Sequence, residues 1–449
     1  PTTGRRPLLF SAEGLPEGLF INSKTGVIQG VAKEKKEATV RVMVNNDEGS
    51  DERVVKVITG GRLALTPPLG WNSWNVWGTS IDQQNINDTA EAMVSSGLAA
   101  HGFNFVNIDD GWQGERNDPR GALQPNEKFP DLAGLCEHVH ALGLRIGIYS
   151  TPWVTSYGGY TGGSSGERVR IDLEKDQDLG RWFGERSHHE EDARQWADWG
   201  IDYLKYDWFP WEVPETELMR DALLRCGRDI VYSLSNSAPY KNAAAWARLA
   251  NCWRTTGDIT DTWESMSHIG FAQQRWIPYT GPGHFSDPDM LVVGRLGWGE
   301  VRDNRLTHDE QITHITLWSL LSAPLLLGCD MTALDDFTVR LMSNDEVLGI
   351  NQDSLGRQAY CVKEMRDPGN PASDAAVYAK ELDDGSLAVG LFNRADSPAT
   401  VTIKWFELGI QGPRAARNLW ARADMDTIDE ALSMGIPAHG AQLVRLAKV

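Results

Sequence analysis

The stretch from Gly200 to Pro210 reads G-I-D-Y-L-K-Y-D-W-F-P and is the most informative part of the chain. Its apolar and aromatic residues, Ile201, Tyr203, Leu204 and Tyr206, make a short run that suits a buried strand rather than a helix. Asp207 closes this strand two residues after Lys205, and aromatic rings follow it. A carboxylate at the end of a buried strand is costly to desolvate. Asp207 is therefore either a cap for the next turn or a functional group, and the rest of the chain favours a functional group.

The composition limits the possible classes of protein. With 449 residues, the chain suits one large domain with smaller flanking modules. Hydrophobic residues make up 41% and charged residues 23%, as in ordinary globular proteins. The formal net charge of -19 argues against a nucleic-acid partner, since such binders need a basic footprint. The chain has 18 tryptophans, which suit stacking on sugar rings as well as core packing.

Cysteine, histidine and apolar patterns exclude further classes. No apolar run approaches the length that crosses a bilayer, so no membrane insertion is expected. The five cysteines are scattered without C-x-x-C spacing, which indicates mostly buried free thiols and no zinc motif. His188 and His189 precede two glutamates, but neighbouring helical residues point in different directions and no third ligand lies near in the sequence. No metal site and no cofactor are expected.

Residues 1–60 are expected to form a module of their own. Short alternating runs, such as A-T-V-R-V-M-V-N-N at 38–46, are separated by turn residues and predict a small β-sandwich. L-P-E-G-L from Leu15 and T-G-V-I-Q-G from Thr25 resemble the signature of immunoglobulin-like modules. Such modules are usually spacers or packing domains, and Gly60-Gly61 is expected to be the linker.

From residue 61 to residue 352, short apolar runs alternate with helical stretches, which predicts a parallel (β/α)8 barrel. The predicted strands are 69–74, 103–108, 144–149, 202–206, 230–234, 252–255, 276–281 and 324–327. The predicted helices include 86–97, 132–142, 192–199 and 310–321.

Polar and aromatic residues cluster after these strands, where such barrels carry their catalytic groups. They are Trp74 and Asn75 after the first strand, Asp109 and Asp110 after the second, Tyr149 and Trp153 after the third, Lys205 and Asp207 at the fourth, Ser235 to Tyr240 after the fifth, Arg254, Asp258 and Asp261 after the sixth, and Gly281 to His284 with Asp287 and Asp289 after the seventh. Packing alone does not explain so many polar groups at one mouth.

Glycoside cleavage uses this set of groups. Carboxylates stabilise the oxocarbenium-like transition state. A nucleophilic Asp207 must be ionised, and Lys205 is expected to lower its pKa. A second carboxyl must hold a proton for the leaving oxygen and then act as a base toward water. Asp109 and Asp110 suit neighbouring sugar hydroxyls, and Trp74 is placed to stack beneath the ring.

Seven motifs occur in order across residues 65–360: W-N-S-W, N-I-D-D-x-W, G-I-Y-S, Y-L-K-Y-D, W-R-x-x-x-D-I-x-D-x-W, G-P-G-H-x-x-D-P-D-M-L and I-N-Q-D-x-L-G-x-Q. Together they resemble glycoside hydrolase family 27, whose members are retaining exo-acting α-galactosidases, α-N-acetylgalactosaminidases and a few relatives that act on other α-linked or arabinopyranosyl sugars. The resemblance implies a (β/α)8 barrel followed by an antiparallel β domain. It implies Asp207 as nucleophile and Asp258 as general acid/base. The candidate contacts of the terminal sugar are Trp74, Asp109, Asp110, Tyr149, Lys205, Arg254 and Asp289.

The chain departs from the family pattern around the pocket. Gly111 and Phe209 stand where members often carry paired cysteines. Trp208 replaces the usual glycine after the nucleophile and is expected to reshape the pocket wall as a substrate contact. Ser235 and Ala238 occupy the loop that faces C2 of the sugar, where typical α-galactosidases carry a glutamate and a bulkier apolar residue. Small residues there resemble α-N-acetylgalactosaminidases.

The segment 153–191 is longer than the connection usual in the family. Its glycine pairs suggest a mobile flap with rings such as Tyr157 at outer subsites, and a solvated insertion is the alternative. His284 is expected to be a hydrogen-bonding part of the pocket wall.

After residue 352 the pattern returns to short alternating strands, at 375–380, 387–392, 400–403, 417–420 and 441–446. The predicted fold is therefore multidomain, α/β plus all-β. It has a small N-terminal β-sandwich (1–60), a (β/α)8 TIM barrel (61–352) and a C-terminal antiparallel β-sandwich (353–449) that stabilises rather than catalyses.

The sequence predicts a retaining exo-α-galactosidase that releases terminal α-linked galactose from a carbohydrate by double displacement. Ser235 and Ala238 keep α-N-acetylgalactosaminidase as the alternative. A remote alternative, from another class, is an inactive carbohydrate-binding protein. No signal-like segment is present, and a secreted or periplasmic setting is expected by association with the immunoglobulin-like module and a polysaccharide-type substrate.

Overall fold

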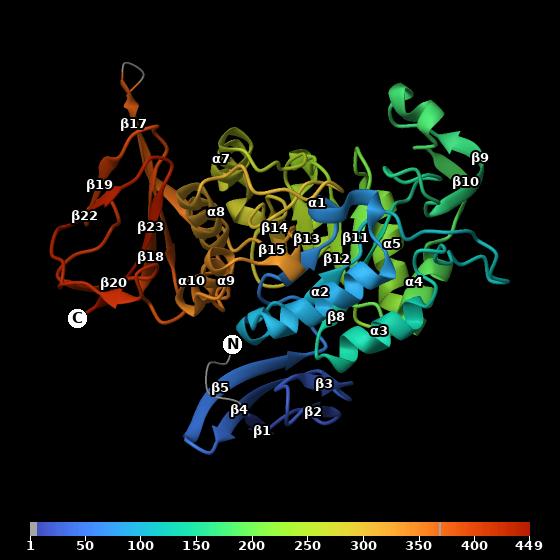
Figure 1. The fold of residues 1–449 in the computed structure, drawn as a ribbon, viewed down its shortest axis with the longest axis horizontal. Coiled ribbons are helices and arrows are strands. Elements are labelled where there is room, and N and C mark those ends of the chain that lie inside the picture. Colours follow the sequence, from blue (N-terminus) through green and yellow to red (C-terminus); the bar gives the residue numbers. More distant parts are fainter. Residues whose placement is uncertain (1–6, 368–369) are drawn as a thin grey trace. The chain divides into compact units, whose positions relative to one another are not determined.

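A computed structural model describes residues 7–367 and 370–449, in which the chain divides into two compact units, Pro1–Leu63 and Ala64–Val449. In the smaller unit, β4 (Lys36–Asn46) and β5 (Gly49–Thr59) form a long antiparallel hairpin, and β1 (Leu9–Glu13) pairs with β4 (Figure 1). The short strands β2 (Leu19–Ile21) and β3 (Ile28–Gly30) make a second antiparallel pair. The side chains of Leu8, Phe10 and Val40 are buried between these elements. The predicted all-β character of this module is confirmed.

The larger unit contains the predicted parallel barrel. Its hydrogen-bonded strands follow the order β14-β13-β12-β11-β8-β7-β6-β15, and every neighbouring pair is parallel. The strands are β6 (Leu69–Asn72), β7 (Phe105–Asn107), β8 (Arg145–Ser150), β11 (Tyr203–Asp207), β12 (Val231–Ser235), β13 (Cys252–Arg254), β14 (Phe285–Asp287) and β15 (Leu325–Leu327). A parallel bridge between Leu291, just after β14, and Leu327 of β15 joins the two ends of the sheet. All carboxyl ends of the strands therefore open on one side.

The prediction of a strand at 276–281 is wrong. Gln273–Tyr279 is a 3-10 helix with Pro278 inside it, and the seventh strand is β14. Proline has no backbone N–H to give to a central strand, and the rings of this segment pack as one face of a short helix. As a consequence, His284 precedes the seventh strand and lies toward the opposite end of the barrel from Asp287.

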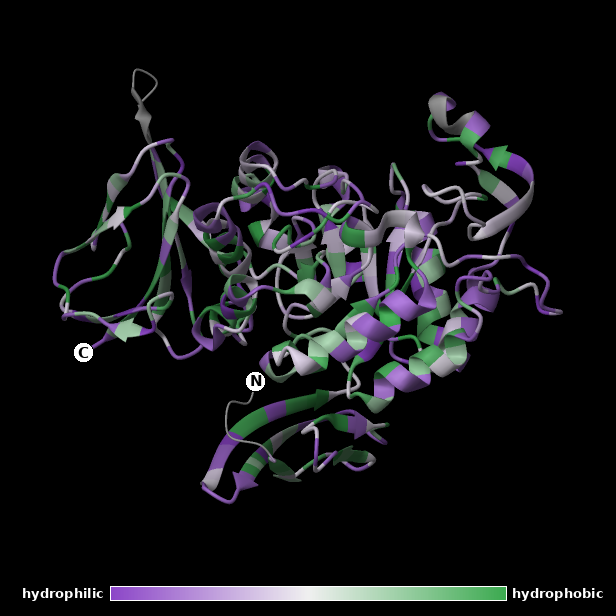
Figure 2. Ribbon diagram, in the orientation of Figure 1, coloured by the Kyte–Doolittle hydropathy of each residue, from purple (hydrophilic) through white to green (hydrophobic). Residues whose placement is uncertain are grey.

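Helices cover the outside of the barrel, and in Figure 2 the bands of hydrophilic and hydrophobic residues alternate along α2 and α3. The helices are α1 (Trp74–Trp77), α2 (Gln83–Ser95), α3 (Leu132–Ala141), α4 (His189–Trp199), α5 (Val213–Arg225), α6 (Ala243–Leu249), α7 (Trp263–Phe271), α8 (His308–Leu320), α9 (Asp336–Met342) and α10 (Asp345–Asn351). Asp82 caps α2 and Thr307 caps α8, each with a reciprocal capping box. Most tryptophans are buried in the core, so packing accounts for them.

The C-terminal part is an antiparallel β domain, as predicted. One sheet has the order β16-β17-β18-β23-β20-β21, and β19 pairs separately with β22. The strands are β16 (Tyr360–Asp367), β17 (Asn370–Glu381), β18 (Leu387–Asn393), β19 (Ala399–Lys404), β20 (Arg414–Asn418), β21 (Ala423–Asp424), β22 (Ala431–Ile436) and β23 (Ala441–Lys448). Strands β16, β21 and β22 were not among those predicted. Val377, Leu391, Ile403 and Val444 lie in the apolar core between the sheets.

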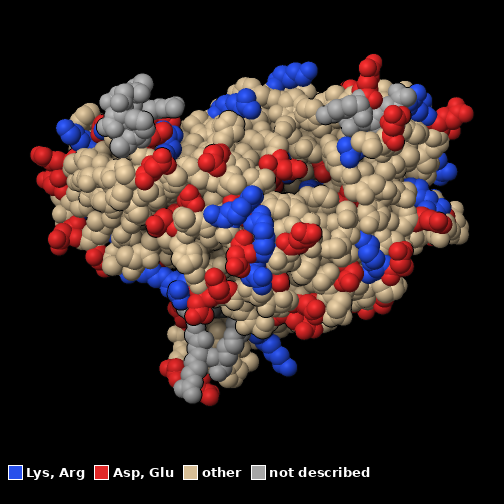
Figure 3. All heavy atoms as spheres, turned by 45° about the horizontal axis from the view of Figure 1, so that its top comes forward, with Lys and Arg blue, Asp and Glu red and all other residues tan. Residues whose placement is uncertain are grey.

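All five cysteines are free, and Cys136, Cys252 and Cys329 are buried. The helices within residues 7–367 and 370–449 are too short or too polar to serve as membrane spans. On the face drawn in Figure 3, acidic side chains are spread widely with basic ones among them, rather than a continuous basic stripe.

Candidate active site

Strand β11 sets the geometry of the site. Side chains alternate across a strand, so Tyr203, Lys205 and Asp207 share the face that points into the barrel. A cavity lies at this end of the barrel, and its walls come from six strands and the segment after β14. It is lined by Asn72, Tyr203, Lys205, Ser233, Ser235, Arg254, Asp287, Asp289, Met290 and Leu326. The cationic, acidic and hydroxyl groups predicted from separate strands therefore converge on one place.

Lys205 is paired with Asp109 rather than bonded to Asp207. Its Nζ lies 2.7 Å from Oδ2 of Asp109, which also accepts a hydrogen bond of 2.8 Å from Nδ2 of Asn72. The Oγ of Ser73 accepts a hydrogen bond of 2.9 Å from the backbone N–H of Asp109. Burial opposes the charge on Lys205, but Asp109 and then Asp207 raise its pKa above the ordinary value. This network holds Asp109 and Lys205 rigidly as a charged pair.

Asp207 is buried at the end of β11, with 6% of its surface exposed. Burial raises the pKa of Asp207 to about 6, and the nearby charges of Asp258 and Asp109 add to the effect. Lys205 and a hydrogen bond from Asn236 act in the opposite direction but do not outweigh burial. Lys205 lowers the pKa of Asp207, as predicted, but desolvation is the larger effect and the net pKa is raised.

Asp258 follows β13 and lies beside Arg254. The guanidinium Nη2 of Arg254 donates to Oδ1 of Asp258 at 2.9 Å, and Nη1 lies 2.9 Å from Oδ1 of Asp289. Desolvation acts against ionisation of Asp258, but the charge and hydrogen bond of Arg254 prevail and lower its pKa. The side chain of Asp258 is 71% exposed, whereas Arg254 and Asp289 are buried. Asp258 thus stands at the rim of the mouth, within electrostatic reach of Asp207.

Asp289 positions the loop that carries Asp258. It has a left-handed φ of 89°, its Oδ2 accepts from the backbone N–H of Ile259 at 2.8 Å, and its Oδ1 accepts from Met290 at 2.7 Å. Its carboxylate oxygens are therefore used by Arg254 and by backbone donors. In this arrangement Asp289 mainly holds the loop in place and has little remaining capacity to accept a hydrogen bond from a sugar.

Asp110 is held by the insertion between β8 and α4. Its Oδ2 accepts a hydrogen bond of 2.6 Å from the backbone N–H of Gly158, and its Oδ1 accepts one of 2.9 Å from Gln113. Burial raises the pKa of Asp110 above its usual value, and these hydrogen bonds partly offset it. The insertion also contains the antiparallel pair β9 (Ser164–Arg170) and β10 (Phe183–Ser187). This segment therefore completes the site instead of standing apart from it.

The aromatic candidates differ in their access to the site. Tyr149 is buried, and Nζ of Lys205 lies over its ring, 5.6 Å from the ring centre. The hydroxyl of Tyr149 has no hydrogen-bond partner among the described residues. Trp74 is partly exposed at the start of α1. Trp208 is completely buried between Tyr206 and Trp211, so it supports the pocket from behind and has no surface for a sugar. The prediction of Trp208 as a substrate contact is not what the structure shows.

The loop after β12 brings Ser235 and Ala238 to the site. Ser235 is the register partner of Asp207 in the parallel pair of β11 and β12. Ala238 donates its backbone N–H to the carbonyl of Arg254 at 2.9 Å. Both are buried and small, as the sequence indicates.

Two predicted strand-end groups lie away from the mouth. Asp261 is fully buried, and Arg302 and Arg305 bind both of its oxygens and lower its pKa to about 2. His284 donates a hydrogen bond from Nδ1 to the carbonyl oxygen of Tyr279 at 2.6 Å and stacks on Trp253. Neither lines the cavity, and His284 is therefore not a wall of the pocket.

Three groups of the site, Asn72, Asn236 and Asp287, belong to predicted strand ends or motifs but were not predicted as catalytic or sugar-binding residues. Asp287 lines the cavity at the end of β14, and burial raises its pKa to about 6 despite the charge of Arg254. Asn72 lies within the W-N-S-W motif, two residues before the predicted Trp74. Asn236 directly follows Ser235, and its place in this loop was the available signal in the sequence.

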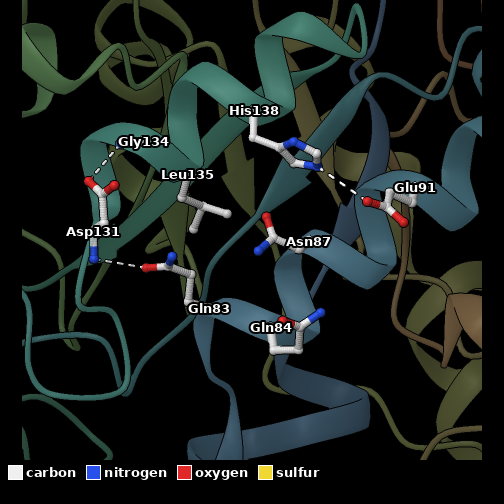
Figure 4. A pocket seen from close by; sticks show the side chains of 8 residues that line it. All are labelled: Gln83, Gln84, Asn87, Glu91, Asp131, Gly134, Leu135 and His138. Carbon is white, nitrogen blue, oxygen red and sulfur yellow. Dashed lines mark hydrogen bonds and ion pairs between the residues drawn. The ribbon is translucent and has the colours of Figure 1, made fainter.

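Two other polar groups of residues, around His188 and on the outside of the barrel, lack the paired carboxylates of the barrel mouth. His188 is bonded through Nε2 to Ser165 Oγ at 2.7 Å, and among the described residues no three His, Cys, Asp or Glu side chains gather as metal ligands. A polar groove lies on the outside of the barrel between α2 and α3, lined by Gln83, Gln84, Asn87, Glu91, Asp131, Gly134, Leu135 and His138 (Figure 4). None of the residues of the barrel mouth takes part in it.

Family models match this architecture along the chain. The model described as "Alpha galactosidase A" matches residues 66–183 and 176–353, which together span more than half of the sequence. The chain belongs to glycoside hydrolase family 27. The model described as "Alpha galactosidase C-terminal beta sandwich domain" matches residues 372–446, and a model of an Ig domain matches residues 2–59. The resemblance of both flanking domains is thus confirmed.

Relatives of this glycoside hydrolase family 27 chain share its length and fold. It is 37% identical over 405 residues to an α-galactosidase from Cyamopsis tetragonoloba, which covers 88% of this chain and 90% of the relative. It is 33% identical over 419 residues to α-galactosidase A from Cellvibrio japonicus, and the match covers 86% of this chain and 93% of the relative. The crystal structure of α-galactosidase I from Mortierella vinacea matches with a TM-score of 0.72 and 28% identity, covering 86% and 98%. A family 27 β-L-arabinopyranosidase from Geobacillus stearothermophilus matches with a TM-score of 0.74 and 27% identity, covering 86% and 97%. The chain is therefore a glycoside hydrolase of the α-galactosidase type.

Proposed function

We propose that this glycoside hydrolase is a retaining exo-α-galactosidase in which Asp207 is the nucleophile and Asp258 the general acid/base. The observation that carries the proposal is that a buried carboxylate, Asp207 at the end of β11, and an exposed carboxylate, Asp258 in the loop after β13, both stand at the carboxyl ends of the barrel strands. Two carboxyl groups in one pocket are the minimum that glycoside hydrolysis requires. Asp109 and Asp110 are fixed beside them as acceptors for sugar hydroxyls.

The reaction proceeds in two displacements. Asp207 attacks the anomeric carbon, and the bond to the leaving oxygen breaks while Asp258 gives that oxygen a proton. Asp258, now ionised, takes a proton from water, and the water oxygen replaces Asp207 at the anomeric carbon. Each displacement inverts the centre, so the product keeps the α configuration.

The ionisation of the free site bears on this cycle. Asp207 is ionised above a pH of about 6, which supports its use as a nucleophile at neutral pH. Arg254 favours the charged form of Asp258 in the free enzyme. A substrate hydroxyl that takes over the hydrogen bond of Arg254 would allow Asp258 to hold the proton that the first step needs.

Two measurements test the proposal. Hydrolysis of p-nitrophenyl α-galactoside, followed by proton NMR during the first minutes, is expected to give the α anomer of galactose first. Release of the β anomer first contradicts a retaining mechanism. In parallel, Asp207→Ala is expected to lower kcat by several orders of magnitude while the circular dichroism spectrum stays unchanged. A folded variant that turns over normally contradicts the assignment of the nucleophile.

α-N-Acetylgalactosaminidase activity is the second candidate, because small buried residues stand at Ser235 and Ala238 in the loop next to Asp207. Space there suits an acetamido group at C2 of the sugar. The enzyme is assayed on p-nitrophenyl α-galactoside and on its 2-acetamido analogue. A higher kcat/KM on the galactoside supports the first candidate, and a higher value on the analogue supports the second.

A further inference from the structure

The loop that follows β12, next to Asp207, is anchored at two points by hydrogen bonds to neighbouring segments. The indole N–H of Trp211, which follows β11, donates to the carbonyl oxygen of Ser235 at 2.6 Å. On the other side, the backbone N–H of Ala238 donates to the carbonyl oxygen of Arg254, the last residue of β13, at 2.9 Å. These two bonds tie the loop to the strand of the nucleophile and to the strand before the general acid. Asn236, which lies with Ser237 between these two anchors, is thereby placed at the end of β11, where its side chain reaches Asp207.

Asn236 adopts a backbone conformation that few side chains accept. Its φ is +78°, in the left-handed region where asparagine is enriched and β-branched residues are strained. In this conformation its Nδ2 donates a hydrogen bond of 2.6 Å to Oδ1 of Asp207. Within the described residues, this is the only hydrogen bond that the carboxylate of Asp207 accepts. The rare conformation therefore directs one amide at one oxygen of the carboxylate.

We propose that Asn236 is a positioning residue of the nucleophile, which holds Oδ1 of Asp207 so that Oδ2 is presented to the anomeric carbon. The inference rests on the proposed role of Asp207. A carboxylate that is anchored through one oxygen loses rotational freedom about its last bond, which favours attack by the other oxygen.

The chemistry of an amide suits this task better than that of a cation. Lys205, the nearest cation in the sequence, is engaged with Asp109 at 2.7 Å. A direct ion pair would favour the ionised carboxylate strongly and reduce its reactivity, whereas a neutral N–H donor favours it moderately. Asn236 thus orients the nucleophile and supports its ionisation in a buried position, while leaving it reactive.

Two variants test this role without disturbing the fold. Asn236→Gly removes the donor and keeps the left-handed backbone, which glycine adopts freely. Asn236→Asp keeps the shape and tolerates the same φ, but it replaces the donor with a carboxylate oxygen. Ser237→Ala, in the same loop, is the matched control. The measurement is the pH dependence of kcat/KM on p-nitrophenyl α-galactoside, together with thermal unfolding of each variant.

The expected result is a fall in kcat/KM of at least about tenfold for both variants, with the acidic limb displaced upward by about 1 pH unit in Asn236→Gly. The displacement is larger in Asn236→Asp, because two like charges then share the site. Ser237→Ala keeps the profile of the parent. An unchanged acidic limb in both folded variants, with or without a loss of activity, overturns the inference, since a purely structural role does not move it.

The failure of this inference differs from the failure of the proposed function. If the parent enzyme hydrolyses the galactoside, Asp207→Ala is inactive and the two Asn236 variants retain the parent profile, only the inference is wrong. If Asp207→Ala is active, the nucleophile itself is misassigned.

Discussion

The guanidinium of Arg254 joins the two carboxylates of the loops that follow β13 and β14. Its Nη2 donates to Oδ1 of Asp258 at 2.9 Å, and its Nη1 lies 2.9 Å from Oδ1 of Asp289. Arg254 is buried and Asp258 is exposed. The cation therefore fixes Asp258, the proposed general acid, at the rim of the mouth without closing access to it.

The first prediction concerns Asp258. In Asp258→Gly, a substrate with a good leaving group such as p-nitrophenolate still forms the glycosyl-enzyme, because this leaving group needs little protonation. Release of the sugar is slow, since no base activates water. Added azide is expected to restore turnover by at least about tenfold and to give galactosyl azide, as measured by p-nitrophenol release and mass spectrometry. Azide without effect on a folded Asp258→Gly variant contradicts the assignment.

The second prediction concerns the cost of burying Asp207. Its pKa in the folded protein is about 6, above the ordinary value of 3.8, so the folded state binds more protons than the unfolded state between these values. The stability that protonation contributes is complete below pH 3.8 and is lost as the pH rises through about 6. Asp207→Asn is therefore expected to raise the free energy of unfolding by about 2–3 kcal/mol at pH 7.5. Urea unfolding at several pH values measures this gain, which should vanish near pH 4; a gain independent of pH contradicts the account.

The third prediction concerns the turn of the insertion at Gly158. A Cβ at this position would lie 2.8 Å from Oδ2 of Asp110, which is closer than real Cβ contacts allow. Gly158→Ala is expected to displace Asp110 and to raise KM for the galactoside by about tenfold or more, with a smaller change in kcat. Gly349→Ala is the control, because its added Cβ meets no atom within 4 Å. Equal kinetics of the two variants would show that Asp110 does not depend on this turn.

The fourth prediction concerns Lys380 in the C-terminal domain. Lys380 is 1% exposed, its Nζ lies 2.7 Å from Ser322 Oγ, and burial lowers its pKa to about 7. Between pH 7 and about 10.5 the unfolded state binds more protons, so the stability of the protein rises with pH across this window. Replacing the buried amine with an apolar side chain of similar length removes the penalty.

Lys380→Met is therefore expected to stabilise the protein by a few kcal/mol at pH 7, with a gain that shrinks toward pH 10. Thermal unfolding at both pH values measures the change. Lys404→Met replaces an exposed lysine of the same domain and is expected to have no pH-dependent effect. A loss of stability in Lys380→Met at pH 7 contradicts this account of the buried amine.

The fold could be predicted well where the chain alternates clear apolar runs with helices. The seventh strand could not, because the rings around Pro278 imitate a strand just before it and the two polar residues of its F-S-D sequence do not form an apolar run. Strand order, and with it the mouth of the barrel, followed from the parallel alternation alone.

The residues of the site were predictable from the strand ends, but their partners were not. Lys205 is two residues from Asp207, yet its ammonium reaches past β8 to Asp109, which follows β7, and only the register of the strands decides this. The net pKa of Asp207 depends on burial, and no local pattern measures burial. The role of Asn236 depends on a left-handed φ and on two anchoring bonds from distant residues.

The most direct test of the central claim is covalent labelling of the nucleophile. The enzyme is incubated with a fluorinated α-galactosyl fluoride before proteolysis and tandem mass spectrometry. With this reagent the glycosyl-enzyme forms faster than it is hydrolysed, so it accumulates. The account predicts one fluorogalactosyl group per chain, attached to Asp207. A label on another carboxylate, or no label on an enzyme that hydrolyses p-nitrophenyl α-galactoside, contradicts it.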